Sequence, residues 1–92
     1  MPRPNPEANS ALPATLDFAS VPAVLTRAQA LIAGGTLDLA GVERADSSGV
    51  ALLLELSRRA RAQGVQLRIS GANAQICNLL EFFKLTKVLA LV

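Results

Sequence analysis

The sequence predicts a single α/β domain in which helices pack on a mixed β-sheet of about four strands. Two observations predict it: short stretches of alternating apolar residues, and between them longer stretches whose apolar residues recur at helical spacing. Strands that alternate with helices call for a largely parallel or mixed sheet with right-handed crossovers. The 92 residues leave room for one domain and no second, so we expect the order (β)-α-β-α-β-α-β over residues 12–92.

The N-terminal segment differs from the rest of the chain. Residues 1–11 contain three of the five prolines and show no apolar periodicity, which predicts a disordered Pro-rich leader. The same segment has no apolar h-region, so it is not a secretory signal. Residues 12–18 then predict a short strand, which Pro13 weakens or confines to a sheet edge.

A first helix is predicted over residues 21–32, where the apolar residues follow helical spacing. Ser20 precedes it as a suitable N-cap. Pro22 is tolerated in the first turn, because the N–H that proline lacks has no helical partner there. Gly34 and Gly35 provide the C-terminal stop.

The later elements continue the alternation, and residues 65–69 form the clearest predicted strand because their pattern has no exception. In order, these elements are a strand at 36–40, a loop at 42–45, a helix at 50–62, a strand at 65–69, a helix from 73 to 83 and a strand at 88–92.

The composition excludes most enzyme chemistry. The chain has no histidine and one cysteine, Cys77, so neither a Ser-His-Asp nor a Cys-His relay can be built. Zinc sites of the Cys/His type and an intramolecular disulfide are excluded for the same reason. Cys77 stands beside Ile76 in a helical pattern, where a small buried thiol is the expected role. We therefore expect a protein that is not an enzyme and that binds no metal or cofactor.

Charge and hydropathy favour a protein partner. The net charge is +2, and the one arginine cluster (Arg58, Arg59, Arg61) is typical of a solvated helix face, so we expect no nucleic-acid binding. The longest apolar run, residues 50–54, is far too short to span a membrane, which excludes direct membrane insertion. A mean hydropathy of +0.39 then indicates apolar surface for a partner protein. A free cysteine without an export signal favours the cytoplasm.

The motif Asp46-Ser47-Ser48-Gly49 joins a predicted strand to a predicted helix. Aspartate and serine are preferred helix caps, so a purely structural role is one interpretation. Helix N-termini also favour negative charge, and a phosphoryl group on Ser47 would meet N–H donors there, although Asp46 would repel it. The hydroxyl of Ser47 is therefore a structural cap, a phosphorylation switch or a polar contact in a docking surface.

The run LDLAGVERADSSGVALLLEL, from Leu37 to Leu56, closely resembles the signature of STAS domains. These domains occur in anti-sigma-factor antagonists, in anion-transporter tails and in the small subunit of the phospholipid-transport ABC system. The later stretch 64–71, followed by a helix and Phe83-Lys84-Leu85, also matches the layout of the family, so the resemblance covers about residues 12–92. It implies that the motif forms the start of the second helix.

Two branches of the family imply two functions. In the MlaB-type transport subunit, a small hydroxyl residue at the place of Ser47 lies in the contact with the cytoplasmic ATPase. In anti-sigma-factor antagonists, which work with an anti-sigma factor and a kinase, the matching serine is phosphorylated. The run Ala-Leu-Leu-Leu after Val50 is more typical of the transport branch. The resemblance thus implies a non-catalytic cytoplasmic subunit, held at the inner-membrane face by its partner, with a partner-binding set of Asp46, Ser47, Ser48, Gly49 and Val50.

The N-terminal part departs from the family pattern. Asp17 matches the aspartate of the family's Gly-Glu-Leu-Asp turn, but the glycine and glutamate are missing. The family has two strands before the first helix, and the Pro-rich leader stands where the first of them would be. A missing strand would leave a sheet edge unpaired, and a homodimer through that edge is a hypothesis.

Overall fold

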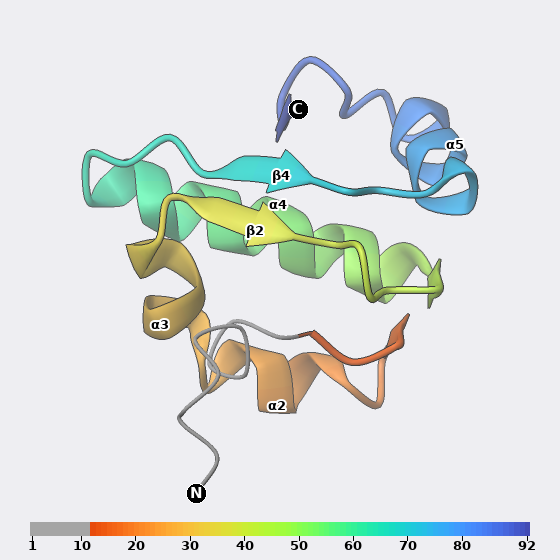
Figure 1. Ribbon diagram of the computed structural model, residues 1–92, viewed down its shortest axis with the longest axis horizontal. Helices are drawn as coiled ribbons and strands as arrows, with labels where there is room; N and C mark the ends of the chain where they lie inside the picture. The colour runs from red at the N-terminus through yellow and green to blue at the C-terminus, as the bar shows by residue number, and fades with distance from the viewer. Residues whose placement is uncertain (1–11) are drawn as a thin grey trace, which may run out of the picture.

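The computed structural model describes residues 12–92 and confirms the α/β class (Figure 1). In chain order, the elements are β1 (Thr15–Leu16), α2 (Val21–Leu25), α3 (Ala28–Ala33), β2 (Thr36–Asp38), β3 (Arg44–Ala45), α4 (Ser47–Ala62), β4 (Arg68–Ser70), α5 (Ala74–Phe82) and β5 (Ala90–Leu91). The leader expected over residues 1–11 lies outside the described residues. The additional first strand of the family, and the homodimer through an open sheet edge, therefore stay predictions.

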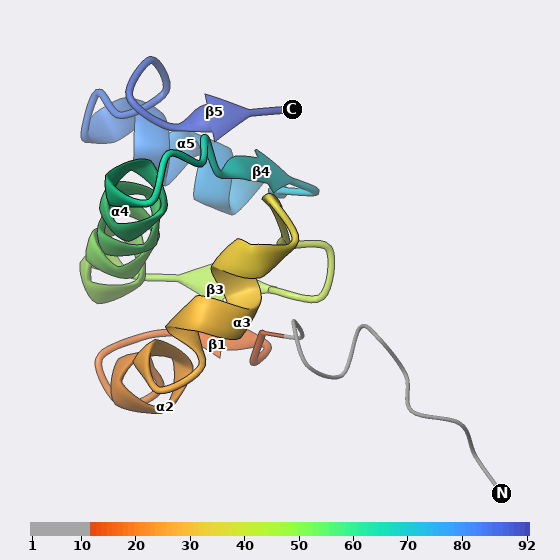
Figure 2. The same cartoon turned by 90° about the vertical axis from the view of Figure 1, so that its left-hand side faces the viewer.

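The strands form two small sheets. β1 pairs with β3, and β2, β4 and β5 follow one another in the second sheet. All of these described ladders are parallel: Leu16 lies opposite Ala45, and Ile69 pairs with Leu37 on one side and Leu91 on the other. The expected mixed sheet is thus parallel in this part of the chain, because at least one helix separates the two strands of every pair. Figure 2 shows β5, β4, β3 and β1 in a row, with α2 and α4 on one side of it.

The hydrophobic core lies between α4 and the strands. The fully buried members of this cluster on α4 and on the strands include Leu16, Leu37, Leu52, Leu53, Leu56, Ala60 and Ile69. Burying one leucine side chain contributes about 1.5–3 kcal/mol, so the apolar face of α4 holds both sheets in place. Over residues 12–92, no helix is long and apolar enough to cross a bilayer.

The helix predicted over residues 21–32 is two helices, so the prediction of one continuous helix is wrong. Between α2 and α3, the hydroxyl of Thr26 donates a hydrogen bond to the Ala23 carbonyl at 2.6 Å. Arg27, which follows, has φ −107° and ψ 14°, outside the helical range. Threonine hydroxyls that bond to the preceding turn compete with the helical backbone, whereas the apolar spacing simply continues across the break.

The segment 42–45, predicted as a loop, contains the short strand β3. The N–H groups of Glu43 and Arg44 both donate to the carbonyl of Ala14, at 2.6 and 3.2 Å. Further on, the N–H of Asp46 donates to the carbonyl of Leu16 at 3.0 Å. A strand of two residues has too few positions to show alternation, so its pairing with β1 could not be seen in the sequence.

The helices α4 and α5 end in the same hydrogen-bonded turn. After α4, Gly64 has φ 78°, and the N–H groups of Gly64 and Val65 return to the carbonyls of Arg61 and Ala60. After α5, Lys84 takes the equivalent left-handed position with φ 60°, and Leu85 N–H returns to the Leu80 carbonyl at 2.8 Å. This is the Schellman motif, in which glycine is the usual residue at the left-handed position.

Candidate functional site

The predicted motif forms the N-terminus of α4, and Asp46 is its N-cap. The Asp46 Oδ1 accepts hydrogen bonds from the N–H groups of Ser48 at 2.8 Å and Gly49 at 3.1 Å. The backbone of Asp46 is extended (φ −110°, ψ −169°), as at other capped helix starts. Asp46 is therefore a structural helix cap, and its carboxylate binds two of the N–H donors at the helix end.

The two serines differ in their surroundings. Ser47 is the first residue of α4; its side chain is exposed, and its hydroxyl forms no hydrogen bond within residues 12–92. Ser48 is half-buried and faces a groove beside the helix. The motif thus presents one hydroxyl to solvent and one to a neighbouring apolar surface.

Gly49 and Val50, the last two residues of the predicted set, lie in the core. A Cβ built on Gly49 would lie 2.8 Å from the Cβ of Leu16 and would overlap the Leu16 carbonyl oxygen. Val50 is only 4% exposed, and its N–H donates to the Asp46 carbonyl at 3.0 Å. These two residues hold the motif against β1, and the accessible part of the site is Asp46, Ser47 and Ser48.

Asp17 lies beside this motif. Leu16 and Ala45 are partners in the parallel ladder of β1 and β3, so Asp17 and Asp46 leave the same edge of the sheet. The Asp17 Oδ1 accepts from Ser20 N–H at 3.0 Å, and the Ser20 hydroxyl accepts from Asp17 N–H at 3.0 Å. The prediction that the side chain of Ser20 caps the following helix is therefore wrong, because its hydroxyl is turned back to Asp17 and to the Thr15 carbonyl.

An apolar groove, which the sequence did not predict, continues from the motif along α4. It has a volume of about 320 Å³ and lies between α2 and α4, which are in contact. Its lining residues are Phe18, Val21, Pro22, Leu25, Ser48, Ala51, Leu52 and Glu55. Phe18 is 83% exposed at this groove. Val21 and Leu25, one turn apart on α2, are only partly buried beside fully buried Val24, and nothing in their spacing distinguishes them from core residues.

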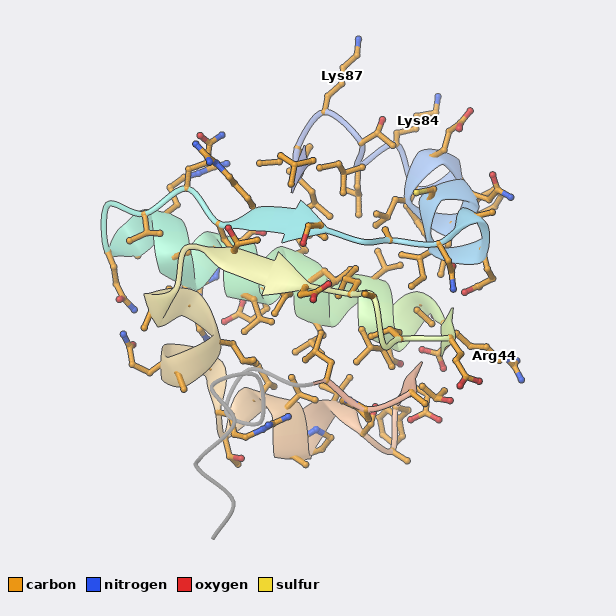
Figure 3. All side chains as sticks on the ribbon, viewed as in Figure 1. Arg44, Lys84 and Lys87 are labelled. Atoms are coloured by element: carbon orange, nitrogen blue, oxygen red, sulfur yellow. The ribbon has the colours of Figure 1, made fainter. Side chains whose placement is uncertain are left out.

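Charged side chains at the edge of the groove and beyond it are spread over several elements. The Glu55 carboxylate accepts from Arg58 and Arg59 at 2.7–2.9 Å, and these hydrogen bonds, that of Arg58 first, lower its pKa to about 2. In Figure 3, Arg44 projects from β3, and Lys84 and Lys87 project from the segment between α5 and β5. These cations point away from the body of the domain and do not form a continuous basic stripe.

Cys77 lies away from the motif, on α5. Its thiol is half-buried and is 3.5 Å from the Ala72 carbonyl oxygen, to which it donates. Within the described residues, no three carboxylate or thiol side chains gather as metal ligands would. The chemistry that this site offers is hydrogen bonding and apolar contact.

Comparison with known proteins identifies the family. The family model described as "Mlab, STAS domain" matches residues 11–92, nearly the whole chain. Neither the curated proteins nor the solved structures give a match. The chain therefore belongs to the MlaB STAS domain family, which is generally non-catalytic, and the resemblance drawn from residues 37–56 is confirmed.

Proposed function

We propose that this chain is a non-catalytic cytoplasmic subunit that binds the ATPase of a phospholipid-transport ABC complex and thereby stabilises or tunes its assembly. Its place at the inner-membrane face comes from that partner. The observation that carries the proposal is the continuity of the Asp46–Val50 motif with the apolar groove. Ser48 belongs to both, so exposed polar groups and an open apolar surface form one face of the domain.

The chemistry of this face suggests what it binds. The groove offers apolar walls, including the exposed ring of Phe18, and would bury an apolar side chain of a partner. At its end, Asp17 and Asp46 place two carboxylates at one sheet edge, and the Oδ2 atom of Asp46 has no hydrogen-bond partner in residues 12–92. A matching ATPase surface carries an apolar side chain next to a hydrogen-bond donor, such as arginine.

Docking at this face requires an accessible hydroxyl and a shallow surface around it. Ser47 is exposed at the start of a helix in which the Asp46 carboxylate already caps the N–H groups of Ser48 and Gly49. The hydroxyl is thus free to donate to or accept from a partner without any change in the fold. A larger side chain at this position would hold the partner away from the groove, and a negative one would also add to the two aspartates.

Co-purification with the ATPase tests the proposal. We expect Ser47→Arg and Ser47→Glu to abolish it while the circular dichroism spectrum stays unchanged. Ala51→Arg blocks the groove and is expected to do the same. Ala62→Arg is the matched control, because Ala62 is also an exposed alanine of α4 but lies at the far end of the helix. Undiminished binding by the Ser47 and Ala51 variants would overturn the proposal.

The regulatory alternative, an anti-sigma-factor antagonist switched by phosphorylation of Ser47, has one observation in its favour. The Ser47 hydroxyl is exposed and open to a kinase. Against it, the N–H groups of Ser48 and Gly49 are already taken by the Asp46 carboxylate, which a phosphoryl group would have to displace or repel. Intact-mass measurement of the chain from cells decides between them. A phosphorylated form at Ser47 supports the switch, and an ATPase partner with no phosphate supports transport.

A further inference from the structure

Among residues 12–92, no strand ladder joins the two sheets. β3 pairs only with β1, so among the described strands it has no neighbour on the side that faces α5. Two amide side chains from the start of α5 take that place. Asn73 donates to the carbonyls of Val42 and Glu43, at 3.2 and 3.0 Å. Figure 1 shows α5 at the same end of the molecule as β3 and the start of α4.

Gln75 makes the closer imitation of a strand. Its Oε1 accepts from the Ala45 N–H at 3.0 Å, and its Nε2 donates to the Ala45 carbonyl at 2.9 Å. Both polar groups of one strand residue are therefore satisfied by a single side chain. Ala45 itself is 7% exposed, so these groups have little access to water.

The bonds to Gln75 complete the anchoring of the segment that leads into the motif. The N–H groups of Arg44 and Asp46, on either side of Ala45, donate in the opposite direction to the carbonyls of Ala14 and Leu16. β3 is therefore held by β1 on one side and by Gln75 on the other. The next residue is Asp46, whose carboxylate sets the first turn of α4.

We propose that Gln75 is a positioning residue of the docking face: its two hydrogen bonds to Ala45 fix the orientation of β3 and thereby the positions of Asp46 and Ser47. The part of the inference that concerns partner affinity rests on the proposed function. Without the amide, β3 is held only by the hydrogen bonds that the N–H groups of Arg44 and Asp46 make to the carbonyls of Ala14 and Leu16. The position of Asp46 at the start of α4 is then less firmly fixed. The start of α5 thereby holds the docking face in one conformation without itself contacting the partner.

A matched pair of variants separates this role from general stability. Gln75→Met removes both hydrogen bonds and keeps the side-chain length and helix propensity. The control is Gln29→Met. Gln29 is likewise exposed and second in its helix, and it likewise makes a two-bond amide pair, with Gln63 at 2.9 and 3.0 Å. Gln29, however, is bonded to a side chain at the other end of α4.

Two measurements read out the pair. Amide hydrogen exchange in the free chain follows the N–H groups of Ser48 and Gly49, which Gln75 does not touch. Titration of the ATPase gives the affinity. Because each hydrogen bond makes a modest net contribution, losing two predicts roughly tenfold faster exchange at these amides and roughly tenfold weaker binding for Gln75→Met. Gln29→Met is expected to stay within about twofold of the wild type in both.

The outcomes distinguish the two proposals. Unchanged exchange at Ser48 and Gly49 in Gln75→Met, or equal acceleration by both variants, would overturn the positioning role. If the wild-type chain does not bind the ATPase, the proposed function fails, and the exchange measurement alone still decides whether Gln75 orders the motif. Faster exchange with wild-type affinity would show that the order of the motif does not matter for docking, and the inference would fall.

Discussion

The Cα of Gly49, in the first turn of α4, packs against the backbone of Leu16 in β1, with no space for a side chain between them. The carbonyl of Leu16 at this contact also accepts the N–H of Asp46 at 3.0 Å. One backbone position of β1 therefore supports both the helix and the residue that caps it. This close contact between α4 and β1 therefore determines how far Ser47 projects from the surface of the domain.

We expect Gly49→Ala to lower the free energy of unfolding by about 2–3 kcal/mol, because the added methyl group must push α4 away from β1. Urea-induced unfolding measures the change. Gly41→Ala is the control, since nothing lies within 4 Å of a Cβ at that position, and its effect should stay within about 0.5 kcal/mol. Similar losses for the two variants would show that the contact with Leu16 can relax.

The turns that end α4 and α5 both predict that glycine is the more stable residue at the left-handed position. Lys84 is a non-glycine residue with φ 60°, a conformation that disfavours a residue with a Cβ. Lys84→Gly should therefore stabilise the domain by about 0.5–1 kcal/mol. Gly64→Ala, at the equivalent turn with φ 78°, should destabilise it by about 1 kcal/mol. Thermal unfolding of both variants checks the pair, and a stabilising Gly64→Ala would contradict the explanation.

The cap at Asp46 predicts a moderate stability effect that depends on the type of substitution. Asp46→Ala removes the acceptor of two N–H groups and should cost about 1 kcal/mol, whereas Asp46→Asn keeps an acceptor oxygen and should cost less. Chemical unfolding measures both. Asp38→Ala provides the comparison, because Asp38 accepts a single bond, from Ala40 N–H at 2.9 Å, and caps no helix. An Asp46→Asn variant as unstable as Asp46→Ala would show that charge matters more than capping.

The carboxylate of Glu55 predicts a dependence of stability on pH. Its pKa is lowered to about 2, mainly by the hydrogen bond from Arg58 and then by that from Arg59. The folded state therefore favours the ionised form. Its small contribution is complete above a pH of about 4.5 and is lost as the pH falls toward 2. A titration of the Glu55 carboxyl signal by NMR should give a midpoint near 2.

Two arginine variants test the cause of that shift. Arg58→Ala should raise the Glu55 midpoint toward its ordinary value, because it removes the largest contribution. Arg61→Ala is the control, since Arg61 is exposed on the same helix and makes no ion pair with Glu55. A midpoint near 4.5 in the wild-type chain would mean that these exposed pairs do not persist in solution.

Much of the fold could be predicted from periodicity and helix-end signals. The helices predicted at 50–62 and from 73 to 83 correspond to α4 (Ser47–Ala62) and α5 (Ala74–Phe82). The side chain of Asn73 caps α5, and Gly64 lies in the turn that ends α4. These features are local, because the residues that determine them are near one another in the chain. The motif at 46–49 was identified for the same reason, and its cap has the expected geometry.

The parts that could not be predicted depend on contacts between distant segments. β3 exists because its N–H groups reach Ala14, about 30 residues earlier, and because Gln75 reaches Ala45 from 30 residues later. The groove likewise needs α2 and α4 to lie side by side, which no pattern within either helix reveals. The break at Thr26 was missed for a different reason: a single side-chain hydrogen bond decides it, and the apolar spacing does not change.

The parallel ladders also determine how this chain can reach its native state. No two strands paired among residues 12–92 are joined by a hairpin turn, so no ladder can form early from neighbours in sequence. Of the described helices, only α4, with 16 residues, is long enough to have appreciable helicity by itself. Refolding is therefore expected to begin with α4 as the nucleus on which the strands collect, and to be slower than that of a helical bundle of similar size.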